Sequence, residues 1–195
     1  KNPLIHCITS PIAINDCANV VLALGAKPIM AEHPKEVEGV TKSARALGVS
    51  LANITDVRAE SMMISGKAAL DSEIPSVLDA VGVTCSQFRK ALAEQFIREC
   101  RPSVIKGNVS EIKALAGVDF SASGIDVGEN DRVSRENRAA LEYMTSVVKK
   151  LAENTGSVVM ATGETDIISD GKKTYYIAQL SEKMRKTLEK LFKNL

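Results

Sequence analysis

The chain has no tryptophan, and aromatic residues make up only 4% of its 195 residues. Its core must therefore be aliphatic and rich in alanine. Neither sign of charge dominates, because 25 Lys and Arg residues stand against 24 Asp and Glu residues, for a net charge of +1. This balance gives no electrostatic reason to bind nucleic acid or an anionic membrane.

Long apolar runs and paired cysteines are also absent. The longest apolar runs, such as 20–24, are far too short to span a bilayer, and no charged-then-apolar secretory leader opens the chain. The four cysteines are Cys7, Cys17, Cys85 and Cys100. Because no two of them have C-x-x-C spacing, the pattern favours neither a common zinc site nor a disulfide framework. We therefore expect reduced thiols and a cytoplasmic protein, in which Cys7 and Cys85 are small buried apolar residues.

Short β-branched segments alternate with longer amphipathic ones along the chain. The predicted strands are 4–9, 27–31, 46–51, 76–79, 103–106 and 157–162. The predicted helices are 11–24, 35–45, 56–72, 87–99, 109–116 and 134–154. Strands separated by helices of this length form right-handed crossovers in a mostly parallel sheet. We therefore predict one α/β domain over 1–195, with helices on both faces of the sheet.

Two later segments differ from this alternation. Asp170-Gly171, between 165–169 and 173–177, predicts a β-hairpin. Segment 117–132 has no periodicity and is predicted to be a loop.

The opening segment, 6–30, predicts a strand, a turn, a helix and a second strand. Pro11 suits the first helical turn, Ser10 can cap that helix, and Gly25 can end it. His6 lies among apolar neighbours, where a hydrogen-bonded core histidine is the better interpretation than a catalytic base.

Candidate site residues follow three of the predicted strands, where parallel sheets place their chemistry. Asp79 ends an apolar strand and could hold a hydrated Mg²⁺ or accept a proton from a hydroxyl group; the alternative is a cap for the next turn. Lys106 could neutralise a phosphate. Glu111 could hold Mg²⁺ through water, although Asn108-x-x-Glu111 also resembles a capping box. Thr162 could contact a phosphate chain or simply begin a turn.

Four motifs, in this order, resemble the hydroxyethylthiazole kinase family: 6–30, 74–86, 106–111 and 161–170. The resemblance covers about residues 1–177 and implies a ribokinase-like fold. It also implies phosphorylation of the alcohol of hydroxyethylthiazole by ATP with Mg²⁺, in thiamine salvage. A homotrimer with substrate sites near subunit boundaries is the implied assembly.

The same resemblance assigns roles to six residues. Met30 and Asn15 lie on the substrate side. Lys106 and Thr162 match nucleotide contacts, and Asp79 and Glu111 match the acids that organise Mg²⁺ and phosphate: these four complete the predicted site.

The chain departs from the family pattern at several positions. Ser10, Ser50-Leu51-Ala52 and Asp79-Ala80 stand where the family has Asn, Asn-x-Gly and Asp-Pro. The family's Gly-Thr-Gly-Cys-like loop, which supplies the anion hole and a Cys, is absent, so no catalytic residue is intact. An amphipathic helix is predicted over 179–195 instead, closing a shortened sheet.

We therefore expect the family fold with at most residual nucleotide or thiazole binding, and with impaired or no catalysis. The alternative is a truncated or engineered scaffold without activity, monomeric if redesigned. A natural binding or assembly protein is a third interpretation.

Overall fold

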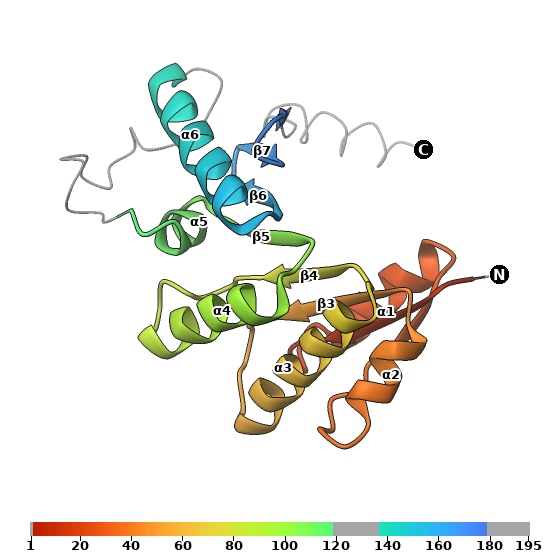
Figure 1. Cartoon of the computed structure of the whole chain (residues 1–195). Coiled ribbons are helices and arrows are strands. Elements are labelled where there is room, and N and C mark those ends of the chain that lie inside the picture. Colours follow the sequence, from red (N-terminus) through yellow and green to blue (C-terminus); the bar gives the residue numbers. More distant parts are fainter. Residues whose placement is uncertain (1, 119–136, 179–195) are drawn as a thin grey trace.

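A computed structural model of the chain describes residues 2–118 and 137–178, which form an eight-stranded sheet (Figure 1). The strands are β1 (Leu4–Ile8), β2 (Lys27–Ile29), β3 (Ala46–Ser50), β4 (Ser76–Asp79), β5 (Val104–Asn108), β6 (Val158–Thr162), β7 (Thr165–Ser169) and β8 (Thr174–Ala178). Their order is β2-β1-β3-β4-β5-β6-β7-β8. The first six pair in parallel, whereas β7 and β8 pair antiparallel. The predicted mostly parallel sheet and its terminal hairpin are confirmed.

Six helices connect the strands in the described part of the chain: α1 (Ile14–Ala23), α2 (Val37–Ser43), α3 (Asp56–Asp71), α4 (Gln87–Cys100), α5 (Val109–Leu115) and α6 (Arg138–Thr155). Polar side chains cap four of them by accepting a hydrogen bond from a backbone N–H in the first turn: Thr55, Ser86, Asn108 and Asn137. These caps explain why the helices begin close to the predicted positions.

Side chains of the parallel strands alternate between two faces of the sheet, as the two-residue period of a strand requires. Helices α2 to α6 pack on one face, which we call the covered face (Figure 1). Its strand residues are buried: His6, Ile8, Leu47, Val49, Leu78, Ile105, Val159, Ala161 and Ile167.

The opposite face, the open face, carries only α1 in the described part of the chain. Its strand residues include Cys7, Gly48, Ser50, Val77, Asp79, Lys106, Met160 and Ile168. They are half-buried or exposed, and Val77 retains 40% of its accessible surface. Helices therefore lie on both faces, as predicted, but they bury one face far more completely than the other.

The core on the covered face is aliphatic, as the composition predicts, and Phe96 is its one fully buried aromatic side chain among the described residues. Helices α3 and α4 approach each other closely at Gly66. A Cβ atom there would lie 2.6 Å from the Cys100 sulfur and 2.6 Å from the Phe96 ring. Only glycine permits this contact.

Helix α1 begins later than predicted. It starts at Ile14 without a side-chain cap, so the prediction that Ser10 caps a helix starting at Pro11 is wrong. Residues 11–13 form a turn, in which the carbonyl of Ser10 accepts hydrogen bonds from Ala13 and Ile14. Gly25 ends the helix with φ +79°, as expected.

Several predictions concern residues outside the described part of the chain. They include the helix over 179–195, most of the loop over 117–132 and the first residues of the helix over 134–154. Among the described helices, none has the length and apolar character needed to cross a membrane.

Candidate functional site

Three polar side chains meet on the open face at the carboxyl ends of neighbouring strands. Lys106 Nζ of β5 lies 3.0 Å from Asp79 Oδ1 of β4. The hydroxyl of Ser50, at the end of β3, donates to Asp79 Oδ2 over 3.0 Å. Both carboxylate oxygens are thus held, while the Asp79 and Lys106 side chains remain 30% and 40% exposed. We call these three residues the Asp79 cluster.

The Asp79 cluster follows from strand order, because β3, β4 and β5 are adjacent and in register. Ser50 pairs with Asp79, and Asp79 pairs with Lys106. The structure therefore brings together Asp79 and Lys106 as predicted from the strand ends. Ser50 was identified only as a departure from the family pattern, and its role as a partner of Asp79 was missed. The strand-end rule would have found it, since Ser50 also follows an apolar strand.

Glu111, in the first turn of α5 directly after β5, is engaged by the backbone on both oxygens. Oε2 accepts from the N–H of Asn108 over 2.7 Å, and the Asn108 side chain accepts in return from the N–H of Glu111 over 2.9 Å. Oε1 accepts from the N–H of Gly82, in the loop after β4, over 2.8 Å. The capping-box alternative is thus confirmed. Glu111 is 6% exposed, and it ties the loops that follow β4 and β5 to each other.

Arg89 of α4 supports the same loop, and sequence reasoning did not single it out. Its guanidinium donates to the carbonyl of Leu51 and lies under Gly82, where a Cβ atom would come within 3.3 Å of it. Gly82 has φ +77°, which favours glycine. Arg89 therefore links the loops after β3 and β4.

Thr162 ends β6, one strand beyond Lys106. Its hydroxyl donates to the carbonyl of Gly107 over 3.3 Å, and it pairs in register with Asn108. The next residue, Gly163, donates its N–H to Asp166 Oδ1 over 2.9 Å. Thr162 thus lies on the same edge of the sheet as Lys106 and Glu111.

A cavity of about 340 Å³ opens on the open face between α1 and strands β1, β3 and β4. Asp79 and Ser50 form its polar end, while Val77, Cys7 and Cys17 line its body. Burial, together with the neighbouring Cys17, raises the pKa of the Cys7 thiol. The Cys7 thiol therefore acts as a small apolar group facing this space.

Met30 and Asn15 lie away from the Asp79 cluster. Met30 follows β2, which is separated from β4 by β1 and β3. Asn15 is exposed on α1, on the side of the helix away from the cavity-lining Cys17. Asp79, Lys106 and Thr162 thus lie at the ends of β4, β5 and β6, with Glu111 in the helix that follows β5. Met30 lies at the same end of the sheet but on its β1–β2 side, and Asn15 lies on α1.

The predictions for His6 and for two of the cysteines can be compared with the structure. His6 is a buried, hydrogen-bonded core residue, as expected. Cys85 is exposed, so the prediction that it is buried is wrong: it follows the turn at Gly82 and precedes α4. Cys7 is only half-buried, because it faces the cavity.

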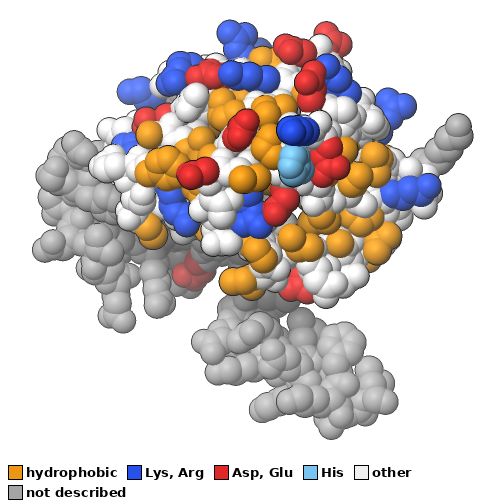
Figure 2. Space-filling model, turned by 90° about the horizontal axis from the view of Figure 1, so that it is seen from below, with side chains coloured by type: hydrophobic (Ala, Val, Ile, Leu, Met, Phe, Trp, Pro, Cys, Tyr) orange, Lys and Arg blue, Asp and Glu red, His pale blue; other side chains and the backbone are white. Residues whose placement is uncertain are grey.

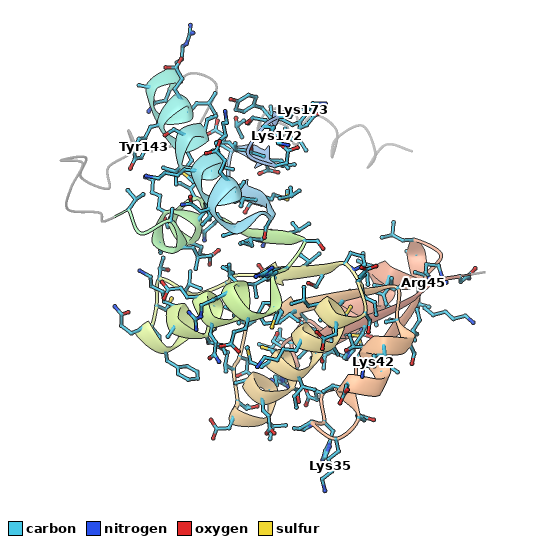
Figure 3. All side chains as sticks on the ribbon, viewed as in Figure 1. Lys35, Lys42, Arg45, Tyr143, Lys172 and Lys173 are labelled. Atoms are coloured by element: carbon cyan, nitrogen blue, oxygen red, sulfur yellow. The ribbon has the colours of Figure 1, made fainter. Side chains whose placement is uncertain are left out.

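Charges of both signs are dispersed on the face that Figure 2 shows. On the side seen in Figure 2, acidic, basic and apolar side chains are interspersed. Lys35 and Arg45 lie far from Lys172 and Lys173 in Figure 3, so these cations belong to no common patch. This distribution agrees with the near-zero net charge.

Comparison with known proteins identifies close sequence relatives. The profile of the hydroxyethylthiazole kinase family matches residues 1–188. A Clostridium botulinum protein named hydroxyethylthiazole kinase 2 is 56% identical over 178 residues, which are 91% of this chain and 66% of that protein. A hydroxyethylthiazole kinase of Clostridium beijerinckii is 41% identical over 173 residues, 89% of this chain and 61% of the relative. The chain thus spans slightly less than two thirds of the length of these relatives.

Solved structures agree with the sequence relatives. The structure of a hydroxyethylthiazole kinase protein from Pyrococcus horikoshii superposes with a TM-score of 0.78 at 28% identity, over 95% of this chain and 65% of that one. An adenosine kinase of Anopheles gambiae superposes with a TM-score of 0.57 at 12% identity, over 93% of this chain and 62% of that one, and shows the shared fold alone. The predicted ribokinase-like fold is confirmed.

Proposed function

We propose that this chain, which belongs to the hydroxyethylthiazole kinase family, binds ATP and hydroxyethylthiazole at the carboxyl end of its sheet and transfers the terminal phosphoryl group to the alcohol. The observation that carries the proposal is the Asp79 cluster, in which a cation and a carboxylate from adjacent strands lie 3.0 Å apart beside a cavity. The names of the relatives support the choice of substrate.

The nucleotide side of the proposed site is basic. Lys106 carries a positive charge that is 40% exposed and held in place by Asp79, so it is available to a phosphate oxygen. Thr162, on the next strand, offers a hydroxyl on the same edge of the sheet. Phosphoryl transfer depends mainly on such positioning and charge neutralisation.

Mg²⁺ fits the chemistry of these residues if it keeps most of its water. No group of three or more His, Cys, Asp or Glu side chains gathers around a common point in the described part of the chain. Asp79 is partly exposed, and each oxygen of Glu111 retains a lone pair beside its backbone hydrogen bond. A magnesium ion held by one or two carboxylates, water and substrate phosphates needs no more than this. When bound, it would neutralise charge on the phosphates.

The substrate side of the proposed site lies along the open face. The cavity beside Asp79 is lined mainly by apolar groups and thiols, which suits a small, weakly polar ring with its hydroxyl directed toward the carboxylate. Met30 would contact the substrate from the β1–β2 side, as the family resemblance implies. Asn15, which faces away from the cavity, would contact a substrate only outside it.

Assembly into a trimer is part of the same proposal. Apolar side chains of α1 and of the turns beside it are exposed, with Ile12 at 91% and Leu24 at 80%. Such a surface suits contact with a second copy of the chain. Sedimentation analysis tests it: a monomer at micromolar concentration would exclude this assembly.

The deciding experiment measures binding and turnover separately. Calorimetry with ATP and Mg²⁺ gives binding, and coupled detection of ADP with hydroxyethylthiazole gives turnover. We expect both, and we expect Asp79→Asn to lower kcat/KM by at least about a hundredfold. Asp71→Asn, an exposed carboxylate at the far end of α3, is the matched control and should leave both unchanged.

Each other outcome has a distinct meaning. Absence of ATP binding would exclude the proposed function. Turnover that survives in Asp79→Asn would place the reaction elsewhere. Binding without turnover would exclude the proposed phosphoryl transfer and would favour the alternative of a family fold with impaired or no catalysis.

A further inference from the structure

Four buried polar side chains that the proposed site does not use converge on one short loop. They come from three elements of the covered face: His6 of β1, Thr41 of α2, and Arg58 and Ser61 of α3. Their exposed fractions are 0% for His6, Thr41 and Ser61 and 6% for Arg58. Buried polar groups destabilise a fold unless they are hydrogen-bonded. Four of them around one loop therefore indicate a specific structural role for that loop.

His6 holds Ala31, the first of the two loop residues that these side chains contact. Its Nε2 lies 2.9 Å from the carbonyl oxygen of Ala31, which can only accept, so Nε2 carries the proton. Nδ1 therefore accepts from the hydroxyl of Thr41, 2.8 Å away. Burial lowers the pKa of His6, which keeps the ring in this neutral form. One ring thus connects β1, α2 and the residue that follows Met30.

Helix α3 fixes the next residue, Glu32. The hydroxyl of Ser61 donates to the Glu32 carbonyl over 2.7 Å, and Arg58 Nε donates to the Glu32 carboxylate over 2.7 Å. Arg58 also donates through Nη1 to the carbonyl of Asn53, in the loop after β3, over 2.9 Å. Helices α2 and α3 lie side by side on this face of the sheet (Figure 1).

The loop after β2 is therefore held by two consecutive backbone carbonyls and one side chain. Met30 immediately precedes Ala31 and is half-buried. Arg58 further joins this loop to the one that starts beyond Ser50, the partner of Asp79. The planar guanidinium of Arg58 serves both loops through two nitrogen atoms whose N–H directions are fixed relative to each other.

We infer that His6, Thr41, Arg58 and Ser61 are positioning residues that fix the loop 30–32 and, through it, Met30 against the carboxyl end of the sheet. The functional part of this inference, that a fixed Met30 orients the alcohol, rests on the proposed function. The structural part stands without it.

The first test follows Met30 itself. The chain has six methionines, whose ¹³C-labelled methyl groups give separate NMR signals, and Met30→Leu assigns the signal of Met30. Ser61→Ala and Thr41→Val each remove one hydrogen bond of the set. Both should shift and broaden the Met30 signal.

A matched control lies one turn further along α3. The hydroxyl of Ser65 is buried without a hydrogen-bond partner among the described residues, so Ser65→Ala removes the same atom but no bond to the loop. It should leave the Met30 signal in place. Arg58→Lys keeps the charge and provides a further variant if Thr41→Val does not fold. An unchanged Met30 signal in folded Ser61→Ala and Arg58→Lys would overturn the inference.

The second test separates positioning from general damage. Ser61→Ala should raise KM for hydroxyethylthiazole about tenfold, the scale of one hydrogen bond, with kcat and the KM for ATP within about twofold. Equal losses in all three parameters would contradict positioning. If the unmodified chain lacks turnover, the proposed function fails, while the Met30 signal still decides the inference.

Discussion

The two faces of the sheet are built from the same strands but differ in how completely they are buried. On the covered face, alternate residues such as Leu78 and Ile105 are fully buried beneath five helices. On the open face, their neighbours are partly accessible: Val77 is 40% exposed, and the side chain of Lys106 is 40% exposed. The covered face supplies most of the apolar burial that stabilises the fold.

This difference explains where the chemistry lies. A carboxylate and a cation at half exposure keep part of their hydration, so Asp79 and Lys106 need only each other and Ser50 as partners. The same pair on the covered face would pay a large desolvation cost. Polar groups on the covered face are instead neutral or fully paired, as His6 and Arg58 are. Stability and reactivity are thus separated by one residue along each strand.

The sharpest test of the comparison uses adjacent residues of β4. Leu78→Ala removes a side chain that is 0% exposed in the core under α3 and α4, and should lower the free energy of unfolding by about 3 kcal/mol. Val77→Ala removes a side chain from the open face, and should cost less than about 1 kcal/mol. Urea denaturation measures both. Equal losses would show that the open face is as well packed as the covered one.

A second test compares two carboxylates at the same end of the sheet. Glu111→Gln leaves one carbonyl oxygen where two carboxylate oxygens accept backbone N–H groups, so Gly82 or Asn108 loses its acceptor. We expect a loss of about 1–2 kcal/mol in the free energy of unfolding. Asp79→Asn should change stability by less than that while it lowers activity.

Glu60→Gln on the exposed side of α3 is the control for Glu111→Gln, with an expected change within about 0.5 kcal/mol. If Glu111→Gln is as stable as the unmodified chain but inactive, the carboxylate serves the chemistry rather than the loop.

Much of the fold could be predicted from local signals. Alternating burial in β3 and β6, the capping box at Asn108 and the hairpin at Asp170-Gly171 each depend on residues close in sequence. The strand-end rule also found Asp79 and Lys106, because parallel strands bring their carboxyl ends to one edge.

The features that could not be predicted from the sequence depend on tertiary packing. Period-two alternation is the same whichever face the helices cover, so it could not indicate that Val77, rather than Leu78, is left exposed. The partners of His6 lie 25 and 35 residues away, and no local pattern connects them. Helix α1 starts late because the chain turns at 11–13, although Pro11 is well suited to a helical first turn.

The smallest expected effect is a pH dependence of the free energy of unfolding that arises from His6 on the covered face. Burial lowers the pKa of His6, an effect that its hydrogen bond to Ala31 and the charge of Glu36 only partly offset. The unfolded chain takes up a proton near pH 6.5, whereas the folded chain takes it up at lower pH. Stability is therefore complete above about pH 6.5 and falls as the pH drops through that value toward the folded pKa, by at most about 1.4 kcal/mol per pH unit.

Denaturation in urea at pH 7.5 and pH 5.8 measures this slope, in a range where carboxylates and amines of ordinary pKa change little. His6→Gln removes the titrating group and should flatten the slope, whatever its effect on absolute stability. His33→Gln, at the chain's other histidine, is the matched control, since His33 is exposed in the loop before α2 and its ring makes no hydrogen bond to the covered face in the described part of the chain. A slope that survives in His6→Gln would mean that the covered face holds another group that resists protonation, and the separation of the two faces would then be less complete than their burial indicates.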